Sequence, residues 1–119
     1  MRKKYYHAAT PETMRKIIAD GIVKRGWDGC VYLCEKPKDA AKFVGIRGHK
    51  KVDVVEVILP ADKVKESFDH SIQFFRCKAF LYEEDIKIKT EAKITEYRFE
   101  QKGRRKESVH FITGQNKNL

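Results

Sequence analysis

The chain has 119 residues, a formal charge of +9, 41% hydrophobic and 36% charged residues, and a mean hydropathy of −0.62. This length fits one domain with a modest core, and the composition is that of a globular protein with a high content of charge. No apolar run approaches the ~18 residues that a membrane span needs. No apolar stretch follows the cationic start at Arg2, so a signal peptide is not expected.

The first predicted elements are a strand and a helix. Alternation over residues 5–9 predicts a short strand. Thr10 followed by Pro11 is typical of a helix N-cap with proline in the first turn. Gly21 then stands where a helix commonly ends, so the pattern predicts a helix over residues 11–20.

The next elements repeat this order. Residues 22–29 are predicted to form a loop, and residues 31–34 a second strand. Pro37 starts a second predicted helix, which Gly45 and Gly48 close.

The second half is dominated by predicted strands. Residues 52–59 are apolar on both faces, which indicates a central strand. Residues 60–68 are expected to form a turn or short helix, residues 74–82 a long strand, and residues 86–99 one or two more. Helices early and strands late predict an α+β fold rather than a doubly wound parallel sheet.

The C-terminal residues 101–119 form a basic tail. They carry five basic residues against one acidic residue, and they have few apolar side chains to bury. We predict one domain over residues 1–100, followed by a tail that either adds an edge strand or is partly disordered. The basic charge either attracts nucleic acid or an acidic partner, or merely keeps the protein in solution.

The cysteines predict reduced thiols. Cys30, Cys34 and Cys77 cannot all pair within the chain, and the first two lie too far apart along one strand for good disulfide geometry. Such thiols are typical of a cytoplasmic protein. Zinc binding by these cysteines with His7 is the alternative, but the usual close pair of cysteines separated by two residues is absent from the sequence, so no metal site is predicted.

His7 and Tyr32 are the first candidates for a binding site. Alternation puts His7 on one strand face with Tyr5 and Ala9, and puts Tyr32 on one face with the two nearby cysteines. If the two strands are neighbours, the histidine and the tyrosine can meet over a surface lined by small residues. The N-terminus of the helix starting at Pro11 lies beside this surface, and helix N-termini favour anionic ligands.

Several segments in this order resemble the NAD-binding core of the ADP-ribosyltransferase-like superfamily. That superfamily includes ADP-ribosyltransferases with a His–Tyr–Glu pattern and the RNA 2′-phosphotransferases. The resembling segments are residues 7–10, 17–22, 29–33 and 39–43, and a later segment, residues 74–86, is similar to the closing strand of that fold. The resemblance implies a small, split, antiparallel-rich sheet with two or three short helices.

The resemblance also implies site residues and a cofactor. NAD would be the substrate, and ADP-ribose would be transferred to a macromolecular acceptor, either nucleic acid or protein. His7 would hydrogen-bond a ribose hydroxyl, and the backbone of Ala8 would contact the nicotinamide amide. Tyr32 would lie against the nicotinamide ring, Phe43 would support the ring from behind, and Thr10 would line the same cleft.

The third catalytic position departs from the pattern. The family has a glutamate near the start of the closing strand, whereas residues 71–76 contain no acid, and Gln73 is the nearest positional match. Three alternatives follow: Asp69 or Glu83 replaces the glutamate, the chain binds NAD-like ligands without turnover, or it performs phosphotransfer. Candidate phosphate ligands for phosphotransfer are Arg25, Arg47 and Arg76. The rival class is a degenerate binding module of the same fold that contacts nucleic acid or protein through its basic surface.

Overall fold

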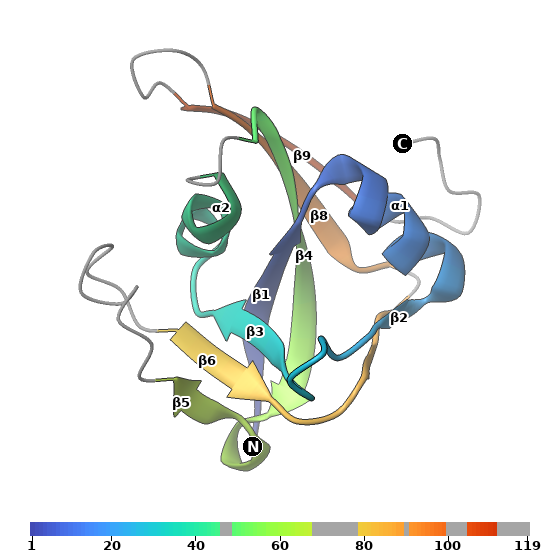
Figure 1. The fold of residues 1–119 in the computed structure, drawn as a ribbon, viewed down its shortest axis with the longest axis vertical. Coiled ribbons are helices and arrows are strands. Elements are labelled where there is room, and N and C mark those ends of the chain that lie inside the picture. Colours follow the sequence, from blue (N-terminus) through green and yellow to red (C-terminus); the bar gives the residue numbers. More distant parts are fainter. Residues whose placement is uncertain (46–48, 68–78, 90, 100–104, 112–119) are drawn as a thin grey trace.

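The chain folds into an α+β structure in which an antiparallel sheet carries one helix on each face (Figure 1). The computed structural model describes residues 1–45, 49–67, 79–89, 91–99 and 105–111. In this part of the chain the main sheet has seven strands, in the order β5–β6–β3–β1–β4–β8–β9. These strands are β1 (Arg2–Ala9), β3 (Val31–Cys34), β4 (Lys51–Pro60), β5 (Lys65–Ser67), β6 (Ala79–Tyr82), β8 (Lys93–Phe99) and β9 (Arg105–Phe111).

The first helix, α1 (Pro11–Asp20), begins and ends at the predicted residues. Thr10 is the N-cap, and its Oγ1 accepts a hydrogen bond from the Thr13 amide at 3.3 Å. Gly21 adopts the left-handed conformation with φ 70°, and its amide donates to the Ile17 carbonyl at 2.8 Å. Both cap predictions are therefore confirmed. No helix of the described residues is long and apolar enough to cross a membrane.

Strand β4 lies in the interior of the sheet, between β1 and β8, as its apolar sequence predicted. It pairs with β1 along a continuous register from Arg2–Pro60 to Ala9–Asp53, and with β8 on its other edge. The long pairing with β4 also extends β1 to Arg2, three residues before the predicted start, because the charged residues there still pair through their backbones.

Two predicted elements differ from the observed ones. The predicted loop over residues 22–29 begins with a short strand, β2 (Ile22–Val23), which pairs with β7 (Ile86–Lys87). The turn or short helix predicted over residues 60–68 begins as expected with a 3-10 helix, η1 (Ala61–Lys63), but its later part, Lys65–Ser67, forms the edge strand β5. Both missed strands pair with residues outside their own segment, far along the chain for β2 and in the next strand for β5, a relationship that local sequence patterns do not contain.

Two apolar clusters fill the two faces of the sheet. On one face, α1 buries Met14 and Ile17 against β1, β3 and β4, and Leu33 and Val55 belong to this cluster. On the other face, α2 (Pro37–Gly45) buries Ala40 and Ala41 in a second cluster. Members of the second cluster from the sheet are Cys34, Val52, Val54 and Tyr97. The two helices therefore cover opposite faces of the sheet.

The remaining strands complete the second half of the chain. Of the predicted long strand over residues 74–82, the structure describes Ala79–Tyr82 as β6, and residues 74–78 lie outside the described residues. Residues 86–99 form two strands, β7 and β8, as one of the two predicted alternatives has it. Within the basic tail, Arg105–Phe111 forms β9 at the edge of the sheet beside β8.

Candidate functional site

A cavity of about 250 Å³ lies where β1 and β3 meet the helix α2. Strand β1 contributes His7 and Ala8, β3 contributes Tyr32, and α2 contributes Phe43. Helix α2 is held beside these strands because its small buried residues Ala40 and Ala41 allow close packing against the sheet. The cavity therefore brings together four of the residues predicted from sequence to bind the nucleotide.

The strands β1 and β3 are neighbours, and their backbone register is formed at Tyr6–Cys34. In addition to this pair, the His7 side chain makes a contact between the two strands. Its Nδ1 lies 2.9 Å from the carbonyl oxygen of Tyr32. A carbonyl oxygen can only accept a hydrogen bond. Nδ1 therefore carries the proton and donates a hydrogen bond to the Tyr32 carbonyl.

Alternation alone does not bring His7 and Tyr32 to one face. Tyr5 and Ala9, which share a face with His7, pack in the cluster beneath α1. Cys34, which shares a face with Tyr32, packs in the cluster beneath α2. Both residues line the cavity, but the observed contact joins the His7 side chain to the backbone carbonyl of Tyr32. The two side chains therefore do not meet over a common sheet face, as the alternation argument predicted.

The electrostatics of His7 favour its neutral form. Burial lowers the pKa of His7 below its usual 6.5, and the hydrogen bond to the Tyr32 carbonyl offsets this only in part. The imidazole is therefore neutral at pH 7. With the proton fixed on Nδ1, the other ring nitrogen, Nε2, carries a lone pair and is a hydrogen-bond acceptor.

Tyr32 lies at the rim of the cavity with 46% of its surface exposed. Its hydroxyl donates a short hydrogen bond to Oδ2 of Asp28, in the loop that leads into β3. This bond is the main cause of a lowered pKa for the Asp28 carboxyl. The ring is thus tied at its outer end by the hydroxyl.

Tyr6 and Glu56 form a polar pair that the sequence patterns did not predict. Tyr6 lines the cavity, and its hydroxyl donates to Oε2 of Glu56 at 3.1 Å across the β1–β4 ladder. Burial, together with the bond to Glu56, raises the pKa of Tyr6 to about 12. The sequence signal for Tyr6 was its alternation with Ala8, which puts both on the α2 side.

The other predicted site residues lie elsewhere or cannot be placed. Thr10 does not line the cavity, and its hydroxyl is engaged in capping α1. Gln73 and Asp69 lie outside the described residues. Glu83 is exposed, and it pairs with Lys65 at 2.7 Å rather than with a cavity residue.

The residues predicted as alternative metal or phosphate ligands do not form a second site among the described residues. In the described ranges, no group of three or more His, Cys, Asp or Glu side chains is placed to hold a metal ion. Cys77, Arg47 and Arg76 lie outside the described residues. Arg25 lies in the loop before β3, where it pairs with Asp85, and it is not part of the cavity lining.

Comparisons with known proteins give no relative. No protein-family model matches the sequence, and no curated protein or solved structure matches it either.

Proposed function

We propose that the cavity binds the nicotinamide end of NAD, and that the chain is an ADP-ribosyltransferase-like protein acting on a macromolecular acceptor. The observation that carries this proposal is the position of His7, Ala8, Tyr32 and Phe43 around one cavity. These residues come from three separate elements, and the sequence resemblance had given all four a role in holding NAD.

The protonation of His7 suits a ribose hydroxyl as ligand. A neutral imidazole whose Nδ1 is held by the Tyr32 carbonyl offers only an acceptor at Nε2. A ribose hydroxyl donates a hydrogen bond, so it complements that nitrogen. The bond to the backbone also fixes the ring orientation before the ligand binds, which lowers the entropic cost of binding.

The size of the cavity suits one end of a dinucleotide. Pockets that enclose a whole drug-sized ligand have volumes of about 300–1,000 Å³. A cavity of about 250 Å³ holds a smaller group, such as a nicotinamide ring with its ribose, and leaves the rest of the ligand along the surface. Tyr32, half-exposed in the cavity lining, supplies an aromatic ring, and a flat, electron-poor ring stacks favourably on aromatic side chains.

The proposed reaction breaks the bond between the nicotinamide ring nitrogen and the anomeric carbon of ribose. Nicotinamide leaves with the bonding electron pair, and an acceptor nucleophile bonds to the anomeric carbon and releases its proton to water. The positive charge that develops on the ribose is stabilised by nearby carboxylates. Asp28 and Glu56 are the described carboxylates that each bind the hydroxyl of a cavity-lining tyrosine.

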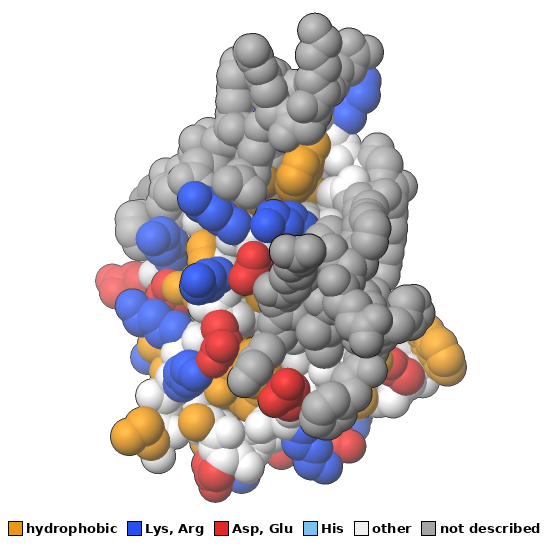
Figure 2. Space-filling view, turned by 90° about the vertical axis from the view of Figure 1, so that its left-hand side faces the viewer, with side chains coloured by type: hydrophobic (Ala, Val, Ile, Leu, Met, Phe, Trp, Pro, Cys, Tyr) orange, Lys and Arg blue, Asp and Glu red, His pale blue; other side chains and the backbone are white. Residues whose placement is uncertain are grey.

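A second candidate is a binding module of the same kind without turnover. The sequence favours it in one respect, because the position expected for the catalytic glutamate carries Gln73. The net charge of +9 would then attract nucleic acid. Lysine and arginine side chains are spread among carboxylates over the face that Figure 2 presents.

A thermal-shift titration with NAD separates the two candidates. NAD at about 100 times its dissociation constant should stabilise the protein by ~2.7 kcal/mol. His7→Ala and Tyr32→Ala should remove this stabilisation, whereas Lys16→Ala, on the exposed surface of α1, should retain it. No shift with NAD, together with a salt-sensitive shift with an oligonucleotide, would favour the binding module.

A further inference from the structure

Trp27 is fully exposed, with 100% of its surface accessible, at the tip of a tight turn before β3. The Gly29 amide donates to the Gly26 carbonyl at 2.9 Å, and the Gly26 amide donates to the Cys30 carbonyl at 2.9 Å. Gly29 has φ 81°, a conformation that a side chain would disfavour. The backbone of the turn is therefore well defined, yet the turn exposes a tryptophan, the largest of the apolar side chains, to solvent.

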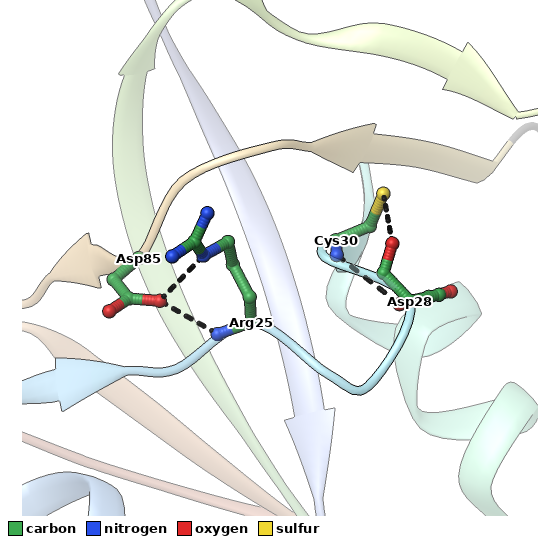
Figure 3. A network of polar contacts seen from close by, with 4 residues as sticks. All are labelled: Arg25, Asp28, Cys30 and Asp85. Carbon is green, nitrogen blue, oxygen red and sulfur yellow. Dashed lines mark hydrogen bonds and ion pairs between the residues drawn. The ribbon is translucent and has the colours of Figure 1, made fainter.

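Side-chain hydrogen bonds pin the turn on both sides (Figure 3). On one side, the backbone amide and Nε of Arg25 both donate to Oδ1 of Asp85, at 2.9 and 3.2 Å. On the other side, Oδ1 of Asp28 accepts from the Cys30 amide at 3.2 Å. Because these bonds already order the turn, a ligand that contacts Trp27 does not have to order it.

Arg25 adds a cation to the same turn. Its Nε is bonded to Asp85, and its two terminal nitrogens have no hydrogen-bond partner among the described residues. A guanidinium held in this way offers two parallel donors, the arrangement that binds phosphate oxygens. Arg25 and Trp27 are two residues apart, so their backbones lie within about 7 Å of each other.

The neighbouring charges leave these donors usable. The carboxylate of Asp28 is engaged by the Tyr32 hydroxyl and the Cys30 amide. Lys24, with 71% of its side chain exposed, pairs with Asp20 at 3.8 Å. Exposed ion pairs of this kind contribute little, so Lys24 is able to turn toward a phosphate instead.

We propose that Trp27 and Arg25 bind single-stranded nucleic acid, with an unpaired base stacked on the indole and a backbone phosphate on the guanidinium. Aromatic stacking beside cationic side chains is the general mode of single-strand binding, and the chain's charge of +9 favours a polyanion. A duplex keeps its base faces inside the stack, so it cannot use the indole in this way.

One residue, Asp28, connects the turn to the proposed NAD cavity. Asp28 follows Trp27 and binds the hydroxyl of Tyr32, which lines the cavity. A strand bound at Trp27 therefore lies beside the cavity mouth, which makes it the acceptor of the proposed reaction. This assignment as acceptor rests on the proposed function, whereas the binding of the strand does not.

Trp27 is the only tryptophan in the chain, so intrinsic tryptophan fluorescence reports directly on this site. We would titrate the protein with oligothymidylate, with the same sequence as a duplex, and with a lysine-rich peptide of equal length. The expected result is quenching by the single strand, which weakens as salt rises, and much weaker quenching by the duplex. Absence of quenching by the single strand, equal quenching by the duplex, or quenching by the peptide alone would overturn the proposal.

Variants and a labelled oligonucleotide test each contact by fluorescence anisotropy. Trp27→Ala should weaken binding about tenfold or more, and Trp27→Phe should restore part of the loss because phenylalanine still stacks. Arg25→Ala should reduce the salt dependence of the affinity, since one phosphate contact is removed. Lys16→Ala, on α1, is the matched control and should bind as the unmodified protein does.

Failure of the two proposals can be told apart in the same preparations. Quenching by the oligonucleotide without any thermal shift from NAD would refute the nucleotide cavity and leave the nucleic-acid site standing. A thermal shift from NAD without quenching would refute the nucleic-acid site and leave the cavity standing.

Discussion

The Nδ1 of His7 donates a hydrogen bond to the carbonyl oxygen of Tyr32 at 2.9 Å, and so joins β1 to β3 beside the cavity. The bond thereby fixes the His7 ring relative to the backbone of Tyr32, although the two residues are 25 positions apart in sequence. The bond determines which nitrogen of His7 is free to accept from a ligand.

His7 predicts a pH dependence of stability. Its pKa in the folded protein lies below the unfolded value near 6.5, because burial disfavours the imidazolium. As the pH falls below about 6.5, the unfolded chain takes up a proton before the folded protein does, so the free energy of unfolding decreases until the folded pKa is passed. Urea unfolding from pH 7.5 down to pH 4.5 should show this loss, and His7→Gln should reduce it. An unchanged pH profile in His7→Gln would contradict the account.

The ring and the hydroxyl of Tyr32 are expected to have separate roles. Tyr32→Phe keeps the stacking face but removes the bond to Asp28, so the pKa of the Asp28 carboxyl should rise toward its usual value. NAD binding should survive this change, whereas Tyr32→Ala should abolish it. Carboxyl titration by NMR and NAD titration by thermal shift measure the two effects. Equal loss of NAD binding in both variants would place the hydroxyl, and not the ring, in contact with the ligand.

A substitution of Thr10 is expected to change the stability of the protein without changing its affinity for NAD. Its hydroxyl caps α1 and does not line the cavity, although the resemblance had placed it in the cleft. Thr10→Ala should lower the free energy of unfolding by about 1 kcal/mol. The affinity for NAD, measured on the folded protein, should stay the same, and Thr10→Asn should recover the stability. A marked loss of NAD affinity in Thr10→Ala would return Thr10 to the site.

Gly45 predicts a steric limit on the position of α2. A Cβ at this residue would lie 2.7 Å from Cε2 of Phe99, closer than carbon atoms pack. Gly45→Ala should therefore destabilise the protein by about 1–3 kcal/mol in urea unfolding. Combining it with Phe99→Leu should recover part of the loss, which a double-mutant cycle would measure as a coupling energy. Additive effects of the two substitutions would show that the contact is not the cause.

Sequence patterns predicted the elements whose signals are local. The caps at Thr10 and Gly21 and the apolar run of β4 required no knowledge of partners. The pairing of β2 with β7 could not be predicted, because it depends on residues that are remote in sequence.

The candidate site shows the same division between local and long-range information. Alternation along the strand predicted which residues share a face with His7, but it could not give the register of Tyr6 with Cys34. That register decides which side chains face α2. The roles of Asp28 and Glu56 could not be predicted either, because only the folded geometry brings each carboxylate to its tyrosine.

The central claim is that the cavity lined by His7 and Tyr32 binds the nicotinamide end of NAD. Mapping of backbone amide shifts by NMR, with isotope-labelled protein and added NAD or nicotinamide alone, tests it most directly. We expect the perturbed amides to cluster at His7–Ala8 in β1, near Tyr32 in β3 and around Phe43 in α2. Nicotinamide alone should perturb a subset of the same residues. Perturbations confined to the opposite face around Met14 in α1, or none at saturating NAD, would contradict it.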